Sequence, residues 1–523
     1  MLRAAQSVQR IANGIRSRAW ALFVLALIEL AYWFSFTAGG LREPPRYTNY
    51  YDLLAEGFRA GHLYLPVQPD PRLLAQANPF DFRFRALWMV DVSLYHGKYF
   101  LYWGPVPALL QALAKSLLRI NAIIGDQYLT FSFLSASAVL GALLFIRIAQ
   151  RLFDALPRWM TALGIATFAF ANPAGYLIAT GGVYQAAICG GQAFMLLGLV
   201  LAFDAVWHGM DRNPQRWRLM LAGSAFGLAL GCRVSLGPCV AMLIAITAIT
   251  MSFAAESRWR SLLRSAIQLG APVAIAVTAL LLYNELRFDD WLEFGTSKQL
   301  TTVPLRMDSA YVPANLYSYS LAPLGVFCRF PYVLQTWTSG PKGLPAWMPV
   351  PPGYLMEEPV VGFLRAVPIT WLLPFAIVAA VSHGLLLLRA SRASTPRRCD
   401  REGRRLGYVW CAACFAVLGS VSGLAALGIF FATMRYLGDI TFGLVALSLL
   451  GGYSLVACAP TRARRIVSAG VYTMLAASTI GLGLLFGYQG YWGQFQTFNP
   501  KLNSEIVRSL SLCERKPAAP ASR

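Results

Sequence analysis

The chain has 523 residues, of which 57% are hydrophobic and only 13% are charged. An average soluble domain carries about 25% charged residues and about 45–50% apolar ones, so this chain has too little polar surface to cover a water-soluble globule. The composition therefore excludes a soluble enzyme, a disordered protein and a disulfide scaffold, and it indicates a polytopic membrane protein. The net charge of +21 does not indicate nucleic-acid binding, because the basic residues gather in short loops between apolar runs.

Apolar runs long enough to cross a bilayer recur along the whole sequence. Because the hydrocarbon core of a bilayer requires about 20 apolar residues in a helix, we expect an all-α polytopic membrane protein with about eleven transmembrane helices. The expected spans are residues 20–38, 127–148, 159–177, 183–206, 218–234, 236–254, 266–285, 365–389, 408–432, 439–457 and 466–488.

The apolar run at 104–119 decides the orientation of the chain. If this run crossed the membrane, the arginine clusters at 147–158, 212–218 and 258–264 would lie outside, against the preference of basic residues for cytoplasmic loops. We therefore expect 104–119 to be a helix on the outer interface. The N-terminus is then cytoplasmic and the C-terminus external, in a multi-pass protein of a bacterial cytoplasmic membrane.

This topology leaves one transmembrane domain over residues 1–490 and an external tail over residues 491–523. Two long loops, 39–126 and 286–362, face the outside. Loops of this length are uncommon unless they carry function, whereas the cytoplasmic loops are short and basic. Any chemistry is therefore expected on the outer side of the membrane.

The first external loop opens with an amphipathic helix. In NYYDLLAEGFRAG (49–61), apolar residues recur with the spacing of one helical face. Asn49 is a suitable N-cap, and Asp52 stands where the acidic member of a capping box would stand. Asp52 is therefore either a capping residue or a functional carboxylate.

A hairpin and a short helix follow in residues 91–110. The alternation on either side of His96 and Gly97 predicts two short strands. Pro105 begins the interfacial helix, because proline is tolerated in a first helical turn. Asp91 directly precedes the hairpin, so it is either a turn-capping residue or a second functional carboxylate.

Three segments, taken with their order and their placement beside the membrane, resemble the GT-C superfamily of membrane glycosyltransferases. They are the loop helix at 51–65, the proline-containing element at 97–110 and the end of the second span at 148–153. More closely, the chain is similar to a branch of bacterial multispanning proteins. The pieces that match this branch are YNELRFDDWLEFG (283–295), GGVYQAAICGG (181–191), GLALGCRVSL (227–236) and RYLGDI (435–440).

The resemblance implies a transferase that takes a sugar from a polyprenyl-phosphate donor. A carboxylate of its first external loop would act as a base or bind a divalent cation. The superfamily usually has an acidic residue just after the first span, and around that position this chain has Tyr47, Thr48 and Asn49. The carboxylate role then passes to Asp52 or Asp91, and the metal ligands stay unknown.

Three arginines map to the outer ends of different spans, namely Arg233, Arg287 and Arg435. Ionisable groups at membrane depth are costly and tend to be functional, and a guanidinium binds phosphate through two parallel charge-assisted hydrogen bonds. We therefore expect the three to bind a lipid phosphate. The alternatives are snorkelling to the interface, ion pairing of Arg435 with Asp439, and ion pairing of Arg287 with the acidic residues beside it.

The sequence thus favours a membrane glycosyltransferase that moves a hexosyl or pentosyl group to a glycan, lipid or protein acceptor outside the membrane. Asp52 and Asp91 are the expected catalytic residues, and the three arginines are the expected lipid-phosphate ligands. Asn49, Lys98 and Tyr184 are expected to make further substrate contacts.

Two other functions stay open. A transporter or flippase for lipid or glycan would have internal repeats and ionisable groups near mid-membrane, and we find neither a repeat nor a mid-span carboxylate in the sequence. A catalytically inactive protein that kept the GT-C fold is favoured by the missing acid around residues 47–49.

Overall fold

The computed structural model describes residues 2–45, 47–154, 156–210, 217–253, 255–335, 343–355, 358–392, 399–490 and 493–513. Within these residues, nine helices are long and apolar enough to cross a membrane. They are α1 (Leu2–Phe36), α5 (Asp126–Leu152), α8 (Val183–Met210), α10 (Gly237–Phe253), α11 (Arg258–Phe288), α14 (Leu373–Arg392), α15 (Cys399–Ser420), α17 (Leu437–Ala457) and α18 (Arg462–Gln489). The all-α polytopic architecture is confirmed.

A tenth expected span is bent. Residues 159–177 fold into α6 (Arg158–Phe170) and α7 (Ala174–Thr180), which meet at 41° across a short break. Pro173 lies in this break, where it lacks the N–H that a continuous helix would use. Counted as one span, the pair brings the number of candidate spans in the described chain to ten.

The eleventh expected span is shorter than the others. Residues 218–234 form α9 (Trp217–Cys232), which has 16 residues and packs between α8 and α11. A bilayer core needs about 20 apolar residues in a helix, so α9 does not meet the length of a full span. Within the described residues, nine or ten helices therefore meet the length of a span, close to the eleven expected.

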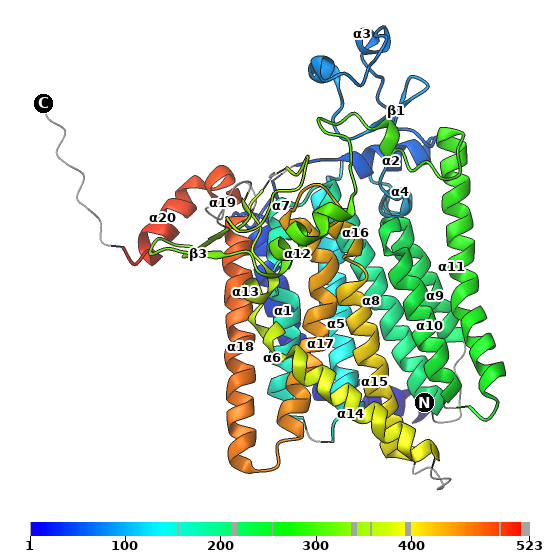
Figure 1. Cartoon of the computed structure of the whole chain (residues 1–523), viewed down its shortest axis with the longest axis vertical. Coiled ribbons are helices and arrows are strands. Elements are labelled where there is room, and N and C mark those ends of the chain that lie inside the picture. The colour runs from blue at the N-terminus through cyan, green and yellow to red at the C-terminus, as the bar shows by residue number, and fades with distance from the viewer. Residues whose placement is uncertain are drawn as a thin grey trace, which may run out of the picture.

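The long helices stand side by side in one bundle (Figure 1). Both long loops and the tail lie at one end of this bundle, which we call the loop side. The start of α1 and the basic connections α10–α11 and α17–α18 lie at the opposite end (Figure 1). This separation agrees with the charge pattern of the sequence, while the cytoplasmic placement of the N-terminus stays a prediction.

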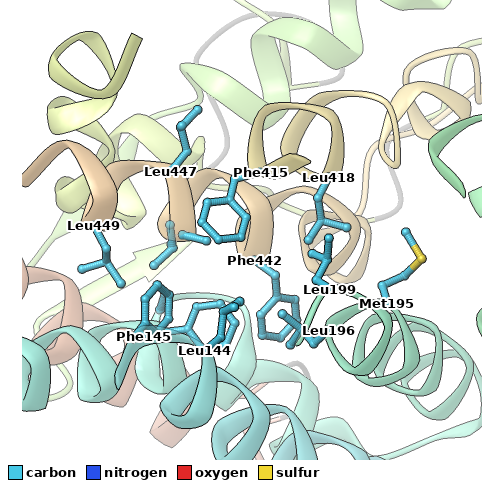
Figure 2. Close-up of a cluster of buried hydrophobic side chains, with 14 of the residues drawn as sticks. Leu144, Phe145, Met195, Leu196, Leu199, Phe415, Leu418, Phe442, Leu447 and Leu449 are labelled. Atoms are coloured by element: carbon cyan, nitrogen blue, oxygen red, sulfur yellow. The ribbon is translucent and has the colours of Figure 1, made fainter. Parts of the chain in front are cut away.

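Helices α8 and α17 form the centre of the bundle. Their apolar windows are 83% buried, whereas those of α11 and α14 are only 11% buried. Large apolar side chains fill the space between the central helices, as Figure 2 shows for Phe145, Leu196 and Phe415. A polar group at the loop-side end of α8 or α17 therefore stands over the middle of the bundle.

The first loop folds largely as expected. Its elements are α2 (Tyr50–Arg59), α3 (Pro71–Leu74), η1 (Phe82–Leu87), β1 (Ser93–Tyr95), β2 (Lys98–Phe100) and α4 (Val106–Leu118). Strands β1 and β2 pair antiparallel, with Ser93 opposite Phe100. His96 and Gly97 have φ of 45° and 71°, as a two-residue turn with positive φ at both positions requires. Helix α4 has 13 residues, too few to cross a bilayer.

The second loop and the tail are joined covalently. The second loop contains η3 (Thr296–Lys298), η4 (Ser309–Tyr311), α12 (Val312–Ser320), β3 (Leu324–Val326) and β4 (Val333–Gln335). The tail contains α19 (Gln494–Phe498) and α20 (Pro500–Leu510). A disulfide connects Cys328 to Cys513, with 5.2 Å between their Cα atoms. The last residues of the tail, 514–523, lie outside the described chain.

Short helices complete the remaining connections. They are η2 (Val234–Leu236), α13 (Phe363–Ala366), η6 (Pro368–Leu372), α16 (Leu424–Leu427) and η7 (Met434–Tyr436). Helices η2 and η7 immediately precede the spans α10 and α17. Helix η2 begins after Arg233 and helix η7 contains Arg435, so both arginines lie at the loop-side ends of spans.

A carboxylate lies near the middle of the first span. Glu29 belongs to α1, within the apolar window 19–36. Ser135 Oγ donates a hydrogen bond to Glu29 Oε2 at 2.7 Å, and Glu29 Oε1 is buried without a partner. The interpretation that the sequence has no mid-span carboxylate is therefore wrong.

Candidate functional site

Helix α2 of the first loop is held at its N-terminus by a residue of the second span. Asp126, in the first turn of α5, accepts hydrogen bonds from the backbone N–H groups of Tyr50 and Tyr51, both at 3.0 Å. Asn49 stands at the N-cap position but makes no side-chain cap hydrogen bond. The capping box expected from Asn49 and Asp52 is therefore wrong, because a distant carboxylate satisfies the free N–H groups of the first turn.

Asp52 points from α2 to the interfacial helix α4. Its Oδ1 accepts hydrogen bonds from Lys115 Nζ at 2.7 Å, from Gln111 Nε2 at 3.0 Å and from the backbone N–H of Ile124 at 3.2 Å. The side chains of Asp52 and Lys115 are only 3% and 1% exposed. Burial opposes the charged ammonium, but the hydrogen bonds with Asp52 and Glu56 prevail and raise the pKa of Lys115. These contacts favour a structural role for Asp52.

Asp91 occupies a left-handed turn before strand β1, with φ of 60°. Its backbone N–H donates to Leu300 O at 2.9 Å, which pairs the first loop with the second. Gln299 Nε2 donates to Asp91 Oδ1 at 3.1 Å, and the Tyr184 hydroxyl also hydrogen-bonds to this carboxylate. Burial raises the pKa of Asp91, while these hydrogen bonds and the charge of Arg435 act in the opposite direction. The result is a half-buried carboxylate held by both loops.

Arg435 lies in η7, directly before the central span α17. Its guanidinium carbon is 4.4 Å from the ring centroid of Tyr184 and 5.5 Å from that of Tyr436. Its Nε is buried without a hydrogen-bond partner, and within the described chain no carboxylate forms an ion pair with it. The side chain of Arg435 is half-buried, and the buried carboxylate of Glu358 attracts its charge. An unpartnered Nε at this depth makes Arg435 a candidate to bind an anion.

Arg233, at the end of α9, approaches the same tyrosine from another helix. Its guanidinium carbon lies 5.5 Å from the ring centroid of Tyr436. Its Nη2 forms an ion pair with Asp439 Oδ2 at 2.6 Å, and Asp439 is buried. Asp439 thus pairs with Arg233 and not with Arg435, whose charge is attracted by the carboxylate of Glu358.

Four of the predicted site residues are therefore brought together from separate segments of the chain. They lie around the rings of Tyr184 and Tyr436, at the loop-side ends of the two central helices. We call this group the outer polar cluster, and its members are Asp91, Tyr184, Arg233, Arg435, Tyr436 and Asp439.

Arg287 does not join the outer polar cluster. Its Nη1 donates to Leu101 O at 2.6 Å, and its Nη2 donates to Asn284 Oδ1 at 2.7 Å. The guanidinium also stacks on Tyr283 and Phe288, with 3.8 Å and 4.5 Å to their ring centroids. These contacts fasten the end of α11 to the backbone of the first loop, and none of them is an ion pair.

Lys98 also lies apart from this cluster. It is an exposed residue of β2, and its Nζ stands 4.3 Å from the ring centroid of Tyr64. A cation over an exposed ring contributes about 0.5–1 kcal/mol. The contact favours a local packing role, and a substrate contact of Lys98 stays a proposal.

Asn49 lines a separate cavity of about 290 Å³, between the segment that follows α1 and the start of α5. Glu43 and Gln127 line it as well, and Gln127 Oε1 is buried without a partner. Glu43 follows the first span and precedes α2, so it stands where the GT-C resemblance leads one to expect an acid. An acidic residue is therefore present in this stretch, and its role as the acid that the resemblance implies is a proposal.

The side chains of the described residues do not form a metal site. In the described ranges, no three His, Cys, Asp or Glu residues lie together in a way that could hold a metal ion. Asp91 with the amide of Gln299 supplies one carboxylate and one neutral ligand, which does not make a complete ligand set.

No protein-family model and no curated protein matches the chain. Among solved structures, the apo oligosaccharyltransferase of Archaeoglobus fulgidus matches 96% of this chain and 61% of its own, at 11% identity and a TM-score of 0.44. The archaeal enzyme AglB from the same organism, in complex with an inhibitory peptide and a dolichol-phosphate, matches 97% and 61% at 12% identity and 0.43. ArnT from Cupriavidus metallidurans, bound to undecaprenyl phosphate, matches 94% and 79% at 11% identity and 0.38.

These structures are thus those of an archaeal oligosaccharyltransferase and of ArnT. The chain spans less than two thirds of the length of the archaeal enzyme. At these identities and TM-scores, the likeness alone defines neither the activity nor the substrates of this chain.

Proposed function

We propose that this protein is a membrane glycosyltransferase, which moves a sugar from a polyprenyl-phosphate donor to an acceptor on the loop side of the membrane. One observation carries the proposal: the half-buried guanidinium of Arg435 has an Nε without a hydrogen-bond partner and stands beside Asp91 and Tyr184. Because Arg435 stands where a membrane span ends, it lies at the same depth in the bilayer as the phosphate of a lipid. The carboxylate of Asp91 beside it can act as the base that accepts the proton of the acceptor hydroxyl.

The two charged groups divide the reaction between them. Asp91 takes the proton of the acceptor hydroxyl while the hydroxyl oxygen forms a bond to the anomeric carbon of the sugar. The bond from that carbon to the phosphate oxygen breaks, and its electron pair leaves with the phosphate. Arg435 stabilises the negative charge that develops there, because its half-buried guanidinium is already in place.

The other members of the outer polar cluster hold these two groups in position. Tyr184 contacts both, through its hydroxyl to Asp91 and through its ring to Arg435. Arg233 shares the ring of Tyr436 with Arg435 but is already neutralised by Asp439. Arg233 therefore contributes less positive potential than Arg435 does. Its ion pair also keeps Asp439 from competing with the phosphate for Arg435.

The sugar is a hexosyl or pentosyl group in this proposal, and the acceptor is a glycan, lipid or protein. The membrane is a bacterial cytoplasmic membrane with the loop side outermost. The unit that acts is the transmembrane domain over residues 1–490, with the tail 491–523 on the same side as the loops.

A transporter for lipid or glycan is the second candidate, because Glu29 supplies the mid-span ionisable group that such a function would use. Glu29 lies on α1, whose apolar window is only 22% buried. A transport site would be expected between the central helices, where α8 and α17 instead pack apolar side chains. The position of Glu29 therefore favours the transferase over the transporter.

The proposal is tested by binding of polyprenyl phosphate to the purified protein in nanodiscs. A hydrogen bond to a charged group contributes about 1.5–3 kcal/mol, so Arg435→Gln is expected to weaken binding roughly 10- to 100-fold. Arg365→Gln is the matched control, since Arg365 is an exposed arginine on the same side of the bundle. Equal affinity of both variants and the wild type would contradict the assignment of Arg435.

The pH dependence of turnover tests the role of Gln299. Asp91 acts as a base only when ionised, so activity is lost as the pH falls through its raised pKa. The hydrogen bond from Gln299 favours the ionised form, and Gln299→Leu is therefore expected to raise the pKa of Asp91 further. The acid limb of kcat/KM should move to higher pH while the plateau at neutral pH changes less. An unmoved acid limb would show that Gln299 does not act through Asp91.

A further inference from the structure

The tail helix α20 lies level with the loop-side ends of two spans. Asn503 Oδ1 accepts a hydrogen bond from the Tyr488 hydroxyl at 2.8 Å, and Tyr488 belongs to the last turn of α18. The side chain of Leu502 packs against Gly39, just beyond the end of α1. Asn499, which caps α20, also donates to Ala38 O at 3.1 Å. These contacts place α20 at the depth where the hydrocarbon core gives way to lipid head groups.

The helix has one apolar face and one polar face. Its apolar residues have the spacing i, i+4, i+5 and i+8, which forms a single stripe; they are Leu502, Ile506, Val507 and Leu510. The polar residues on the other side are exposed, and they are Lys501, Ser504, Glu505 and Arg508. No residue of α20 is buried within the protein. The apolar stripe is therefore only partly covered by the rest of the chain.

Figure 1 shows α20 beside the top of α18, off the flank of the bundle rather than over it. The neighbouring spans turn apolar residues outward at this flank, including Leu30 at 61%, Phe34 at 36% and Leu484 at 42% exposure. Exposed residues of transmembrane helices such as these face lipid tails. The apolar stripe of α20 continues this lipid-facing surface at the interface.

We propose that Pro500–Leu510 is an interfacial helix that binds the surface of the bilayer on the loop side. An amphipathic helix of this kind lies in the plane of the interface, with its apolar face among the head groups and upper acyl chains. Leu512 is 77% exposed and Phe498 is 47% exposed at the two ends of α20. They extend the same contact with lipid.

The disulfide connects the interfacial helix α20 to the second loop. Cys513 lies three residues beyond the end of α20 and is bonded to Cys328. Leu512 N–H also donates to Cys328 O at 2.8 Å, and Phe330 N–H donates to Ser511 Oγ at 3.0 Å. The hairpin of β3 and β4 is thus tied to a helix that rests on the membrane, which fixes one side of the second loop relative to the bilayer.

Spin labelling of the full chain in nanodiscs of phosphatidylglycerol tests the proposal. A nitroxide is attached at Ile506→Cys on the apolar face and, as the matched control, at Glu505→Cys on the polar face. Both are made in a background with Cys399→Ser and Cys458→Ser, so that only the introduced thiol reacts. The nitroxide at 506 should be several-fold more accessible to oxygen than to a water-soluble nickel chelate, and the one at 505 should show the reverse.

Two results would overturn this inference. Equal exposure of both positions to the nickel chelate would place α20 in water, and exclusion of both reagents from position 506 would place its apolar face against protein. The measurement needs no turnover and no sugar donor, so its outcome is independent of the proposed transferase activity. Mass analysis of the Cys328–Cys513 bond confirms that each labelled variant keeps the native connection.

Discussion

Replacing Asp91 with asparagine is expected to lower turnover of a labelled polyprenyl-phosphate sugar by about 10²- to 10⁴-fold, the range that a positioned general base supplies. The amide keeps the size of the side chain and can still hydrogen-bond to Gln299 and Tyr184. It cannot accept the proton of the acceptor hydroxyl. Binding of the lipid phosphate should change little, because the charge of Arg435 is retained. The variant is therefore expected to lose kcat rather than affinity, and steady-state kinetics with the purified protein measure both.

Asp289 offers a matched control for this substitution. It is also an aspartate in a left-handed turn, with φ of 54°, but its side chain is 70% exposed at the end of α11. Asp289→Asn should therefore turn over at close to the wild-type rate. If Asp289→Asn lost as much activity as Asp91→Asn, the effect would come from the loop fold and not from the base.

Glu43→Gln distinguishes Glu43 from Asp91 as the catalytic base. If this variant is inactive while Asp91→Asn turns over normally, the base belongs to the cavity of Glu43, Asn49 and Gln127, and the assignment of Asp91 is wrong. If Asp91→Asn alone is inactive, the outer polar cluster is the reacting site. No turnover by the wild type with any polyprenyl-phosphate sugar would favour the transporter or an inactive GT-C fold.

Much of the outer polar cluster could be predicted because each member carries a local signal. Arg233 and Arg435 stand at the ends of apolar runs, where a charged group is energetically costly and tends to be functional. Asp91 precedes a hairpin that the alternation of residues predicts. The spans themselves follow from composition, since a run of about 20 apolar residues has few other stable environments.

The partners of these residues could not be predicted, because they come from distant parts of the chain. Gln299 is 208 positions from Asp91, and the backbone oxygen of Leu101 is 186 positions from Arg287. Without such contacts, an arginine that binds phosphate and an arginine that fastens a loop look alike. Arg287 differs from Arg435 only in what the fold places beside it.

Glu43 is a different case, since its signal is local. It stands between the first span and the loop helix, in the stretch where the resemblance leads one to expect an acid. The disulfide of Cys328 and Cys513 is a long-range feature again, with 185 positions between the two cysteines.

Lys115→Met is expected to destabilise the first loop by about 3–5 kcal/mol, the cost of breaking a buried ion pair on one side. Lys115 Nζ lies 2.7 Å from Asp52 Oδ1, and both side chains are almost completely buried. Methionine fills a similar volume but leaves the Asp52 carboxylate without its cation. Equilibrium unfolding in mixed micelles measures the loss, and hydrogen exchange over residues 50–59 locates it in α2.

The exposed residue Lys501 is the control, since Lys501→Met should change the free energy of unfolding by less than about 0.5 kcal/mol. The double variant of Lys115→Met with Asp52→Leu removes both charges at once. It should recover only part of the stability, because no buried carboxylate is then left unpaired but Gln111 Nε2 and the Ile124 N–H lose their acceptor. Partial recovery would show that Asp52 holds α2 to α4 through both its ion pair with Lys115 and these hydrogen bonds. If Lys115→Met had wild-type stability, the pair would not fasten the loop, and a functional role for Asp52 would again need consideration.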